Sequence, residues 1–223
     1  MPEPEAKSPE PTRSAAWYAR SGALGSGLHR VSAYLGDEHP DGTWVDLDPA
    51  DLPSAPTLWT TDDANPGLLR VSIAERAAPG APPLWYVWVD EPRASPVAAN
   101  LVAFADDRVA PGTIVDRYAF ASMGVPNDSQ AGAIRWYRSG VIHQIFVGEA
   151  WRRRQVGTCL LYAASAFHQA NGWPGHLRAD GRRTELGERM AASLKHPQRV
   201  HPLTDLMPPM DPAPSADPAT PAP

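Results

Sequence analysis

The sequence predicts an α+β fold: a largely antiparallel mixed sheet flanked by helices. Short runs of β-branched and aromatic residues, which are typical of strands, recur between residues 68 and 147. Segments in which apolar residues recur at helical spacing come only after these runs, at 156–170 and 184–194. An order of strands first, then helix, strand and helix, is that of an α+β protein, whereas regular alternation would predict a parallel α/β sheet.

The two ends of the chain are expected to be disordered. Residues 1–13 are rich in proline and charged residues, and residues 202–223 are rich in proline, alanine and aspartate. Neither segment carries enough apolar surface to compensate for the entropy lost on folding. The remaining residues, 14–201, suit a single domain.

The first elements are predicted from composition and alternation. Residues 15–35 contain scattered apolar residues interrupted by glycines, which indicates one or two short helices. Residues 36–66 are rich in Asp, Pro, Thr and Gly and are interpreted as mostly loop, with one strand near 43–47. Further strands are predicted at 68–74, 84–89, 98–104, 113–120, 133–137 and 141–147, the last two forming a hairpin.

The helices are predicted from periodicity and end signals. In the segment 156–170 the apolar residues follow a helical spacing, and Gly172 and Pro174 end the helix. Residues 175–179 indicate a weak strand. Thr184 is a suitable N-cap for a second helix that runs to about Leu194.

Composition limits the class of protein. The single cysteine, Cys159, excludes an intramolecular disulfide framework and is interpreted as a buried structural thiol. The acidic N-terminus does not look like a signal peptide, and no apolar run approaches the ~18 residues that a membrane span needs. We therefore expect a cytoplasmic protein with no membrane partner. No cluster of His, Cys and carboxylate residues predicts a metal site.

Charge is distributed unevenly along the chain. Residues 1–111 contain 16 acidic and 8 basic residues, a net charge of −8, whereas residues 112–223 contain 9 acidic and 12 basic residues, a net charge of +3. This favours an anionic ligand on the second half and a cationic one on the first. Ordinary solvation of surface charge is the alternative interpretation.

The most informative segment links the strand at 141–147 to the helix at 156–170. It contains three consecutive arginines, Arg152, Arg153 and Arg154, followed by Gln155 and Gly157. The N–H groups at the start of a helix and the positive end of its dipole attract anions, and arginine binds phosphate through two hydrogen bonds. A phosphate or pyrophosphate site is therefore predicted; a solvated arginine cluster on an ordinary turn is the alternative.

These residues resemble the acetyl-CoA signature of the GCN5-related N-acetyltransferase (GNAT) superfamily, Arg/Gln-x-x-Gly-x-Gly/Ala between a strand and a helix. Arg152 matches its first position and Gly157 its last glycine, Trp151 matches the preceding aromatic residue, and Leu160 and Leu161 match paired aliphatic residues. The match covers about residues 141–171. Gln155 replaces the first glycine, which is expected to weaken cofactor binding or remodel the loop.

The resemblance implies an acyl-CoA N-acyltransferase-like fold and an acetyl-CoA-dependent N-acetyltransferase in which an amine attacks the thioester directly. Backbone N–H groups at Phe146 and Val147 would polarise the thioester carbonyl. The cofactor phosphates would be held by the loop residues Arg152, Arg153, Arg154, Gln155, Val156, Gly157 and Thr158.

His143 is the predicted general base. Strand alternation places it on the same face as Val141, Ile145 and Val147, and histidine titrates near neutrality. Arylalkylamine N-acetyltransferases are similar, with a catalytic histidine four positions before the strand-end valine. The alternative is a structural histidine within the sheet.

Two departures leave other functions open. Val141 stands where histone-type members have a glutamate, and the segment 184–194 lacks the tyrosine that many members use as general acid. A non-catalytic acyl-CoA-binding or regulatory protein on the same fold is one alternative, and a nucleic-acid-modifying member is another, which the acidic composition disfavours. The expected partner is a small-molecule or peptide amine, and a homodimer is compatible with these features.

Overall fold

The computed structural model describes residues 16–23, 28–35, 44–52, 57–65, 68–126, 129–194 and 200–207. The predicted disordered segment 1–13 and residues 208–223 of the predicted tail lie outside the described residues. The chain divides into two compact units, residues 1–177 and residues 178–223, and each is described by itself.

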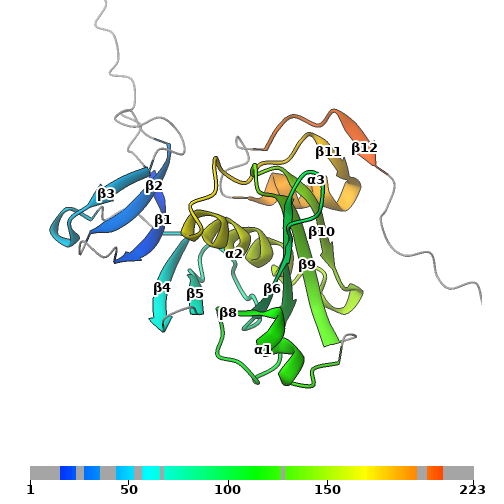
Figure 1. Cartoon of the computed structure of the whole chain (residues 1–223). Helices are drawn as coiled ribbons and strands as arrows, with labels where there is room; N and C mark the ends of the chain where they lie inside the picture. Colours follow the sequence, from blue (N-terminus) through cyan, green and yellow to red (C-terminus); the bar gives the residue numbers. More distant parts are fainter. Residues whose placement is uncertain are drawn as a thin grey trace, which may run out of the picture. The chain divides into compact units, whose positions relative to one another are not determined.

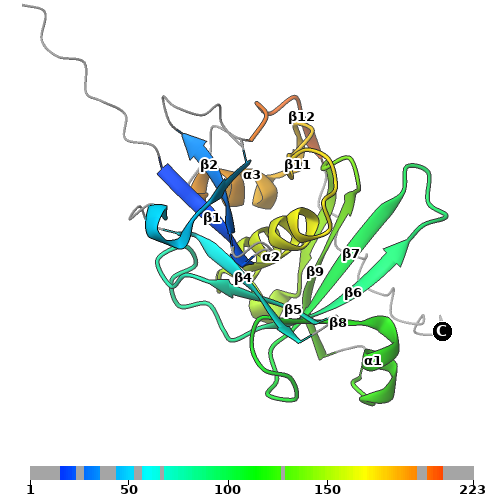
Figure 2. The same ribbon diagram turned by 60° about the vertical axis from the view of Figure 1, so that its left-hand side comes forward.

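The first unit is built on one large mixed sheet (Figures 1 and 2). In the described residues it has ten strands in the order β10-β9-β7-β6-β8-β5-β4-β1-β2-β3. The pairs β1–β4 and β6–β8 are parallel, and the other pairs are antiparallel. The α+β class with a largely antiparallel mixed sheet is therefore confirmed. The strands are β1 Ala16–Ala23, β2 His29–Leu35, β3 Trp44–Leu47, β4 Trp59–Asn65, β5 Leu68–Ile73, β6 Trp85–Glu91, β7 Ala98–Phe104, β8 Thr113–Asp116, β9 Gln130–Tyr137 and β10 Ile142–Val147.

Helix α2, Val156–Ala170, forms the centre of the main core. It contacts β7, β9 and β10 from one end of the sheet and β1, β4 and β5 from the other, so the sheet curves around it. Of the apolar positions predicted from the helical spacing, Val156, Leu160, Ala163 and Phe167 are buried, whereas Ala170 at the end of the helix is exposed. Burial of this apolar stripe is what holds the helix, because an isolated helix of this length is marginal in water.

A buried hydrogen-bonded histidine fixes the far end of α2. The Nε1–H of Trp136 on β9 donates to Nδ1 of His168 at 3.2 Å, and Nε2 of His168 lies 3.1 Å from the carbonyl oxygen of Pro174. An indole N–H can only donate, so Nδ1 accepts and Nε2 carries the proton toward Pro174. His168 is fully buried, and this pairing ties the helix to both the sheet and the segment that follows.

The opposite face of the sheet carries a smaller core. Trp85, Val87, Phe104, Val115 and Val125 form it. Helix α1, Arg117–Ser122, starts beside this core because the Asp116 carboxylate accepts from the N–H groups of Tyr118 and Ala119, both at 2.8 Å. Among the described residues no further buried cluster lies on the rest of this face, toward β10, which is called here the open face.

The second unit is small. Strand β11, Arg182–Thr184, pairs in parallel with β12, Asp205–Met207, and is followed directly by helix α3, Glu185–Ser193. The predicted cap is confirmed, since the Thr184 hydroxyl accepts from the N–H of Gly187 at 3.1 Å. Part of the segment expected to be disordered, 202–223, thus pairs as β12.

Four local expectations are corrected by the structure. The described residues within 15–35 form the strands β1 and β2 and not helices, because pairing within the sheet outweighs weak local preference. Strand β4 lies inside the segment expected to be mostly loop, and the strand expected over 113–120 ends at the Asp116 cap. No strand is assigned to residues 175–179. The strands near 43–47, 68–74, 84–89 and 98–104, the hairpin β9–β10 and both helices are confirmed.

Candidate functional site

The strand–loop–helix segment predicted to bind phosphate is formed as expected. Strand β10 leads through Gly148 and a short 3-10 turn, Glu149–Trp151, into the loop that opens α2. Figure 1 shows α2 near the centre of the view, with β10 to its right. The cofactor residues predicted from the sequence therefore lie on one stretch, from the end of β10 to the first turn of α2.

The loop backbone adopts an unusual conformation. Arg153 and Gln155 have positive φ angles of 62° and 60°, while Arg154 between them does not. Such alternation of the sign of φ is the pattern of a nest, an arrangement in which successive N–H groups point into one concavity that binds anions. The helix also begins without a side-chain cap on its N–H groups, so the first turn of α2 leaves donors directed at the same place.

Gln155 adopts the left-handed conformation that glycine usually supplies. Its φ and ψ are 60° and 8°, a conformation that disfavours a side chain by about 1–2 kcal/mol. Its side-chain oxygen accepts from the Thr158 hydroxyl at 3.0 Å. The glutamine side chain is therefore held against the helix and does not cap it.

The three arginines have different environments. Arg152 is half-buried, and its Nε–H points toward the carbonyl oxygen of Val147 at 3.4 Å. Arg153 and Arg154 are exposed, and the Arg154 guanidinium lies 5.5 Å from the centre of the Trp151 ring. Within the described part of the chain neither Arg153 nor Arg154 forms an ion pair. Two guanidinium groups are thus available to an anion at the nest.

The register of β10 distinguishes Phe146 from Val147. The N–H of Gly148 donates to the carbonyl of Ala131 at 3.0 Å, and Val147 and Phe146 pair with Gly132 and Ala133. In an antiparallel pair, hydrogen-bonded and non-hydrogen-bonded positions alternate. Val147 therefore directs its N–H away from β9, toward the edge of the sheet, whereas the N–H of Phe146 faces β9.

His143 lies at a β-bulge. Ile142 pairs with Trp136 and Gln144 with Arg135, so His143 is the extra residue between them. Ile142 and Ile145 both pack against the main core, which strict alternation would forbid. His143 is exposed, and its ring lies 5.5 Å from that of Tyr137. His143 therefore points to the open face. Strand alternation had predicted that it shares a face with Ile145 and Val147, and this prediction is wrong.

Cys159 is a buried thiol, as predicted. Its side chain is 4% exposed, and burial, with a smaller contribution from Glu75, raises the pKa of the thiol to about 12. It lines a cavity of about 280 Å³ together with residues of β5 and of the segment before β6. A thiol with this pKa stays protonated at neutral pH, which excludes it as a nucleophile under those conditions.

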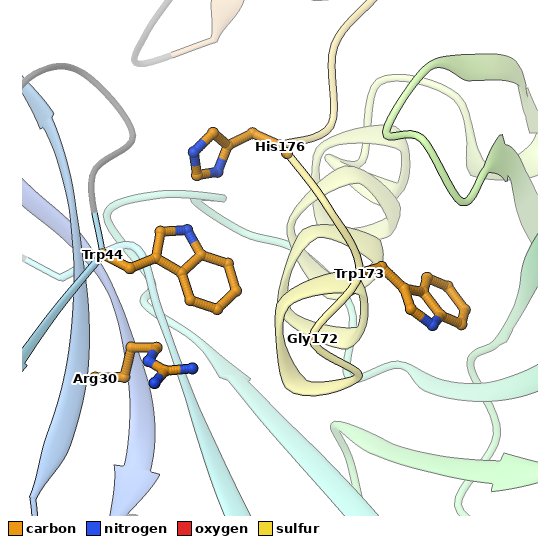
Figure 3. Close-up of a pocket in the computed structure, with 6 residues that line it drawn as sticks. Arg30, Trp44, Gly172, Trp173 and His176 are labelled. Carbon is orange, nitrogen blue, oxygen red and sulfur yellow. The ribbon is translucent and has the colours of Figure 1, made fainter.

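A second pocket lies at the other end of α2. It has a volume of about 380 Å³ and is lined by Arg30, Trp44, Gly172, Trp173, Gly175 and His176. Figure 3 shows the His176 ring beside the Trp44 ring, their centres 6.2 Å apart, and Trp173 turned away from Trp44. A helix of 15 residues spans about 22 Å, so this pocket is separate from the loop. Sequence reasoning missed it, because nothing local indicates that residue 44 meets residue 176.

No helix in the described residues is both long and apolar enough to cross a membrane. The described residues also contain no group of three His, Cys, Asp or Glu side chains that is arranged to hold a metal ion.

Comparison with known proteins identifies no relative. No family model matches the chain, and neither the curated proteins nor the solved structures give a significant match.

Proposed function

We propose that the chain is an acetyl-CoA-dependent N-acetyltransferase that acts on an amine. The observation that carries the proposal is the nest at Arg153–Gln155, which opens an uncapped helix and is flanked by two exposed arginines. Donors converging on one point, with two positive side chains beside them, fit a pyrophosphate better than a single carboxylate. The loop motif and its place between strand and helix add the resemblance to the acyl-CoA N-acyltransferase-like fold.

Two further roles in the proposed reaction are assigned to residues near the two ends of β10. Acetyl-CoA supplies the activated acetyl group as co-substrate. The outward N–H of Val147 is suited to donate to an acyl oxygen at the edge of the sheet, where it needs no rearrangement. His143 accepts the proton of the amine. Four strand residues span about 13 Å, and a general base must lie within hydrogen-bond reach of the proton, directly or through one water. The proposal therefore requires an acceptor whose amine lies near His143 when it attacks the thioester.

Acetyl-CoA is expected to stabilise the folded chain. A ligand that binds only the native state at 100 times its Kd adds about 2.7 kcal/mol to the free energy of unfolding. Thermal melts with and without millimolar acetyl-CoA measure this as a rise in Tm. The absence of both a rise in Tm and a calorimetric heat of binding would remove the basis of the proposal.

The variant Gln155→Gly is expected to keep its affinity for acetyl-CoA. Glycine adopts the required positive φ without strain, and the loss of the hydrogen bond to Thr158 leaves the backbone donors in place. Calorimetric titration should give a Kd within about threefold of the wild type, less than 1 kcal/mol.

A matched variant, Gln155→Val, tests the conformation itself. A β-branched residue is a genuine outlier at positive φ, so the nest is expected to open and the affinity to fall at least about tenfold, or 1.4 kcal/mol. A large loss in Gln155→Gly instead would show that the glutamine side chain is itself a ligand.

A non-catalytic acyl-CoA-binding protein is the second candidate. Helix α3 has the sequence ELGERMAAS and offers no tyrosine that could protonate a departing thiolate. Incubation with acetyl-CoA and a panel of amines, followed by measurement of released CoA, distinguishes the two candidates. Binding without release above the rate of hydrolysis would favour the non-catalytic protein.

A further inference from the structure

Four polar side chains from three strands meet on the open face beside His143. Arg135 on β9 donates to both carboxylate oxygens of Glu91 on β6, with Nη2–Oε2 at 2.7 Å and Nε–Oε1 at 3.1 Å. Asn100 on β7 donates its Nδ2–H to the same carboxylate at 2.6 Å. Side chains on β7 and β9 thus hold the Glu91 carboxylate in one orientation.

Tyr137 connects this ion pair to the histidine. The Arg135 guanidinium lies 5.4 Å from the centre of the Tyr137 ring, and the His143 ring meets the same tyrosine edge-on, at 5.5 Å and an interplanar angle of 62°. The strands that carry Glu91, Asn100 and Arg135, namely β6, β7 and β9, lie inside the sheet or are paired along their length. The backbone register therefore fixes which of these residues are neighbours. The bulge at His143 is what turns its imidazole toward this group.

We propose that Glu91, Arg135 and Tyr137 are positioning residues for His143: the tyrosine ring orients the imidazole, and the Glu91–Arg135 ion pair sets the charge around it. This inference rests on the proposed function for its catalytic meaning. The arrangement itself can be tested without any acetyl transfer.

The physical reason lies in the charge that a base acquires. When the imidazole accepts a proton from an amine it gains one positive charge, and a fixed carboxylate nearby stabilises that charge while a guanidinium opposes it. The pKa of Glu91 is lowered, first by the hydrogen bond from Arg135, then by that from Asn100, and to a smaller extent by His143. Within the described residues His143 interacts with Tyr137 through their rings and with Glu91 through charge. Arg135 contacts both of these groups.

The test follows the imidazole titration of His143 by NMR in the full chain. Glu91→Gln leaves the arginine unopposed, so the midpoint is expected to move to lower pH. Arg135→Gln leaves the carboxylate unopposed, so the midpoint is expected to move to higher pH. Because Glu91 and Arg135 are partly exposed, each shift is expected to be about half a pH unit. The double variant, which removes both charges, should return the midpoint close to that of the wild type.

The tyrosine is tested by a conservative pair. Tyr137→Phe keeps the ring and should keep the chemical shifts of the His143 imidazole, whereas Tyr137→Ala should change them and broaden the signals. Equal midpoints in the wild type and both charge variants, with circular dichroism showing all three folded, would overturn the proposal. A shift in the same direction for both variants would overturn it as well.

Kinetics separate this inference from the proposed function. In an active enzyme the acidic limb of kcat/KM should move with the NMR midpoint in each variant. Opposite midpoint shifts in a protein that neither binds acetyl-CoA nor releases CoA would support the arrangement and refute the acetyltransferase. If acetyl transfer occurs but the acidic limb of the kcat/KM profile against pH is the same in both variants as in the wild type, only the positioning role is refuted.

Discussion

The variant Gly157→Glu is expected to lose at least about 100-fold in affinity for acetyl-CoA while the chain stays folded. Gly157 is the second residue of α2, where the N–H groups of the first turn face the proposed phosphate site. A carboxylate there competes for those donors and repels the pyrophosphate; the loss of two charge-assisted hydrogen bonds at about 1.5 kcal/mol each accounts for the factor. Isothermal titration calorimetry measures it.

The fold is expected to survive because the same change favours the helix. Glycine is a poor helix residue, and an acidic side chain in the first turn interacts favourably with the helix dipole. Thermal melts without ligand should therefore show an equal or higher Tm. Gly157→Gln, which has the same size without the charge, separates repulsion from bulk and should retain more affinity. Wild-type affinity in Gly157→Glu would place the cofactor elsewhere.

The strand–loop–helix segment could be predicted because its signals are local. A β-branched run, a basic loop and a helical stripe of apolar residues each indicate one element without help from distant residues. The same holds for the Thr184 cap, whose hydroxyl is close in sequence to the N–H that it accepts from. Where local preference and the global fold agree, sequence reasoning succeeds.

The geometry of the loop was not predictable in the same way. Nothing in the residue types of Arg153 and Gln155 announces a positive φ, which is uncommon outside glycine; the turn between β10 and α2 imposes it. The expectation that Gln155 remodels the loop followed from the absence of glycine. In the structure Gln155 itself adopts the left-handed conformation, and its side-chain oxygen accepts a hydrogen bond from the Thr158 hydroxyl.

The position of His143 depended on a single inserted residue. Alternation along a strand is a reliable guide only while the ladder is regular, and one bulge exchanges the faces of every residue beyond it. The bulge appears only in the pairing of β10 with β9. It allows Ile142 and Ile145 both to pack against the main core. The strands β1 and β4 escaped prediction for a related reason: their partners are distant in the sequence, and the parallel pairing of β1 with β4 has no local signal.

His143→Ala is expected to reduce turnover with an amine acceptor by roughly 10²–10⁴-fold at neutral pH, the usual contribution of a positioned acid–base group. The Kd for acetyl-CoA should hardly change, because His143 lies on the open face and the loop that opens α2 is separate from it. His201→Ala is a matched control, since this histidine is also exposed but belongs to the second unit; it should turn over like the wild type.

The pH dependence decides whether the histidine acts as a base. An alkyl amine loses its proton unaided as the pH approaches its own pKa of about 10, so the deficit of His143→Ala should shrink steadily between neutral and alkaline pH. In the wild type kcat/KM should rise with pH through the range in which histidine loses its proton, because only the neutral imidazole can accept one. A deficit of constant size at all pH values would mean that His143 orders the strand or the acceptor and that the proton leaves by another route. The carboxylates near the open face would then be the groups to substitute next, beginning with Glu91, whose lowered pKa keeps it ionised throughout this range.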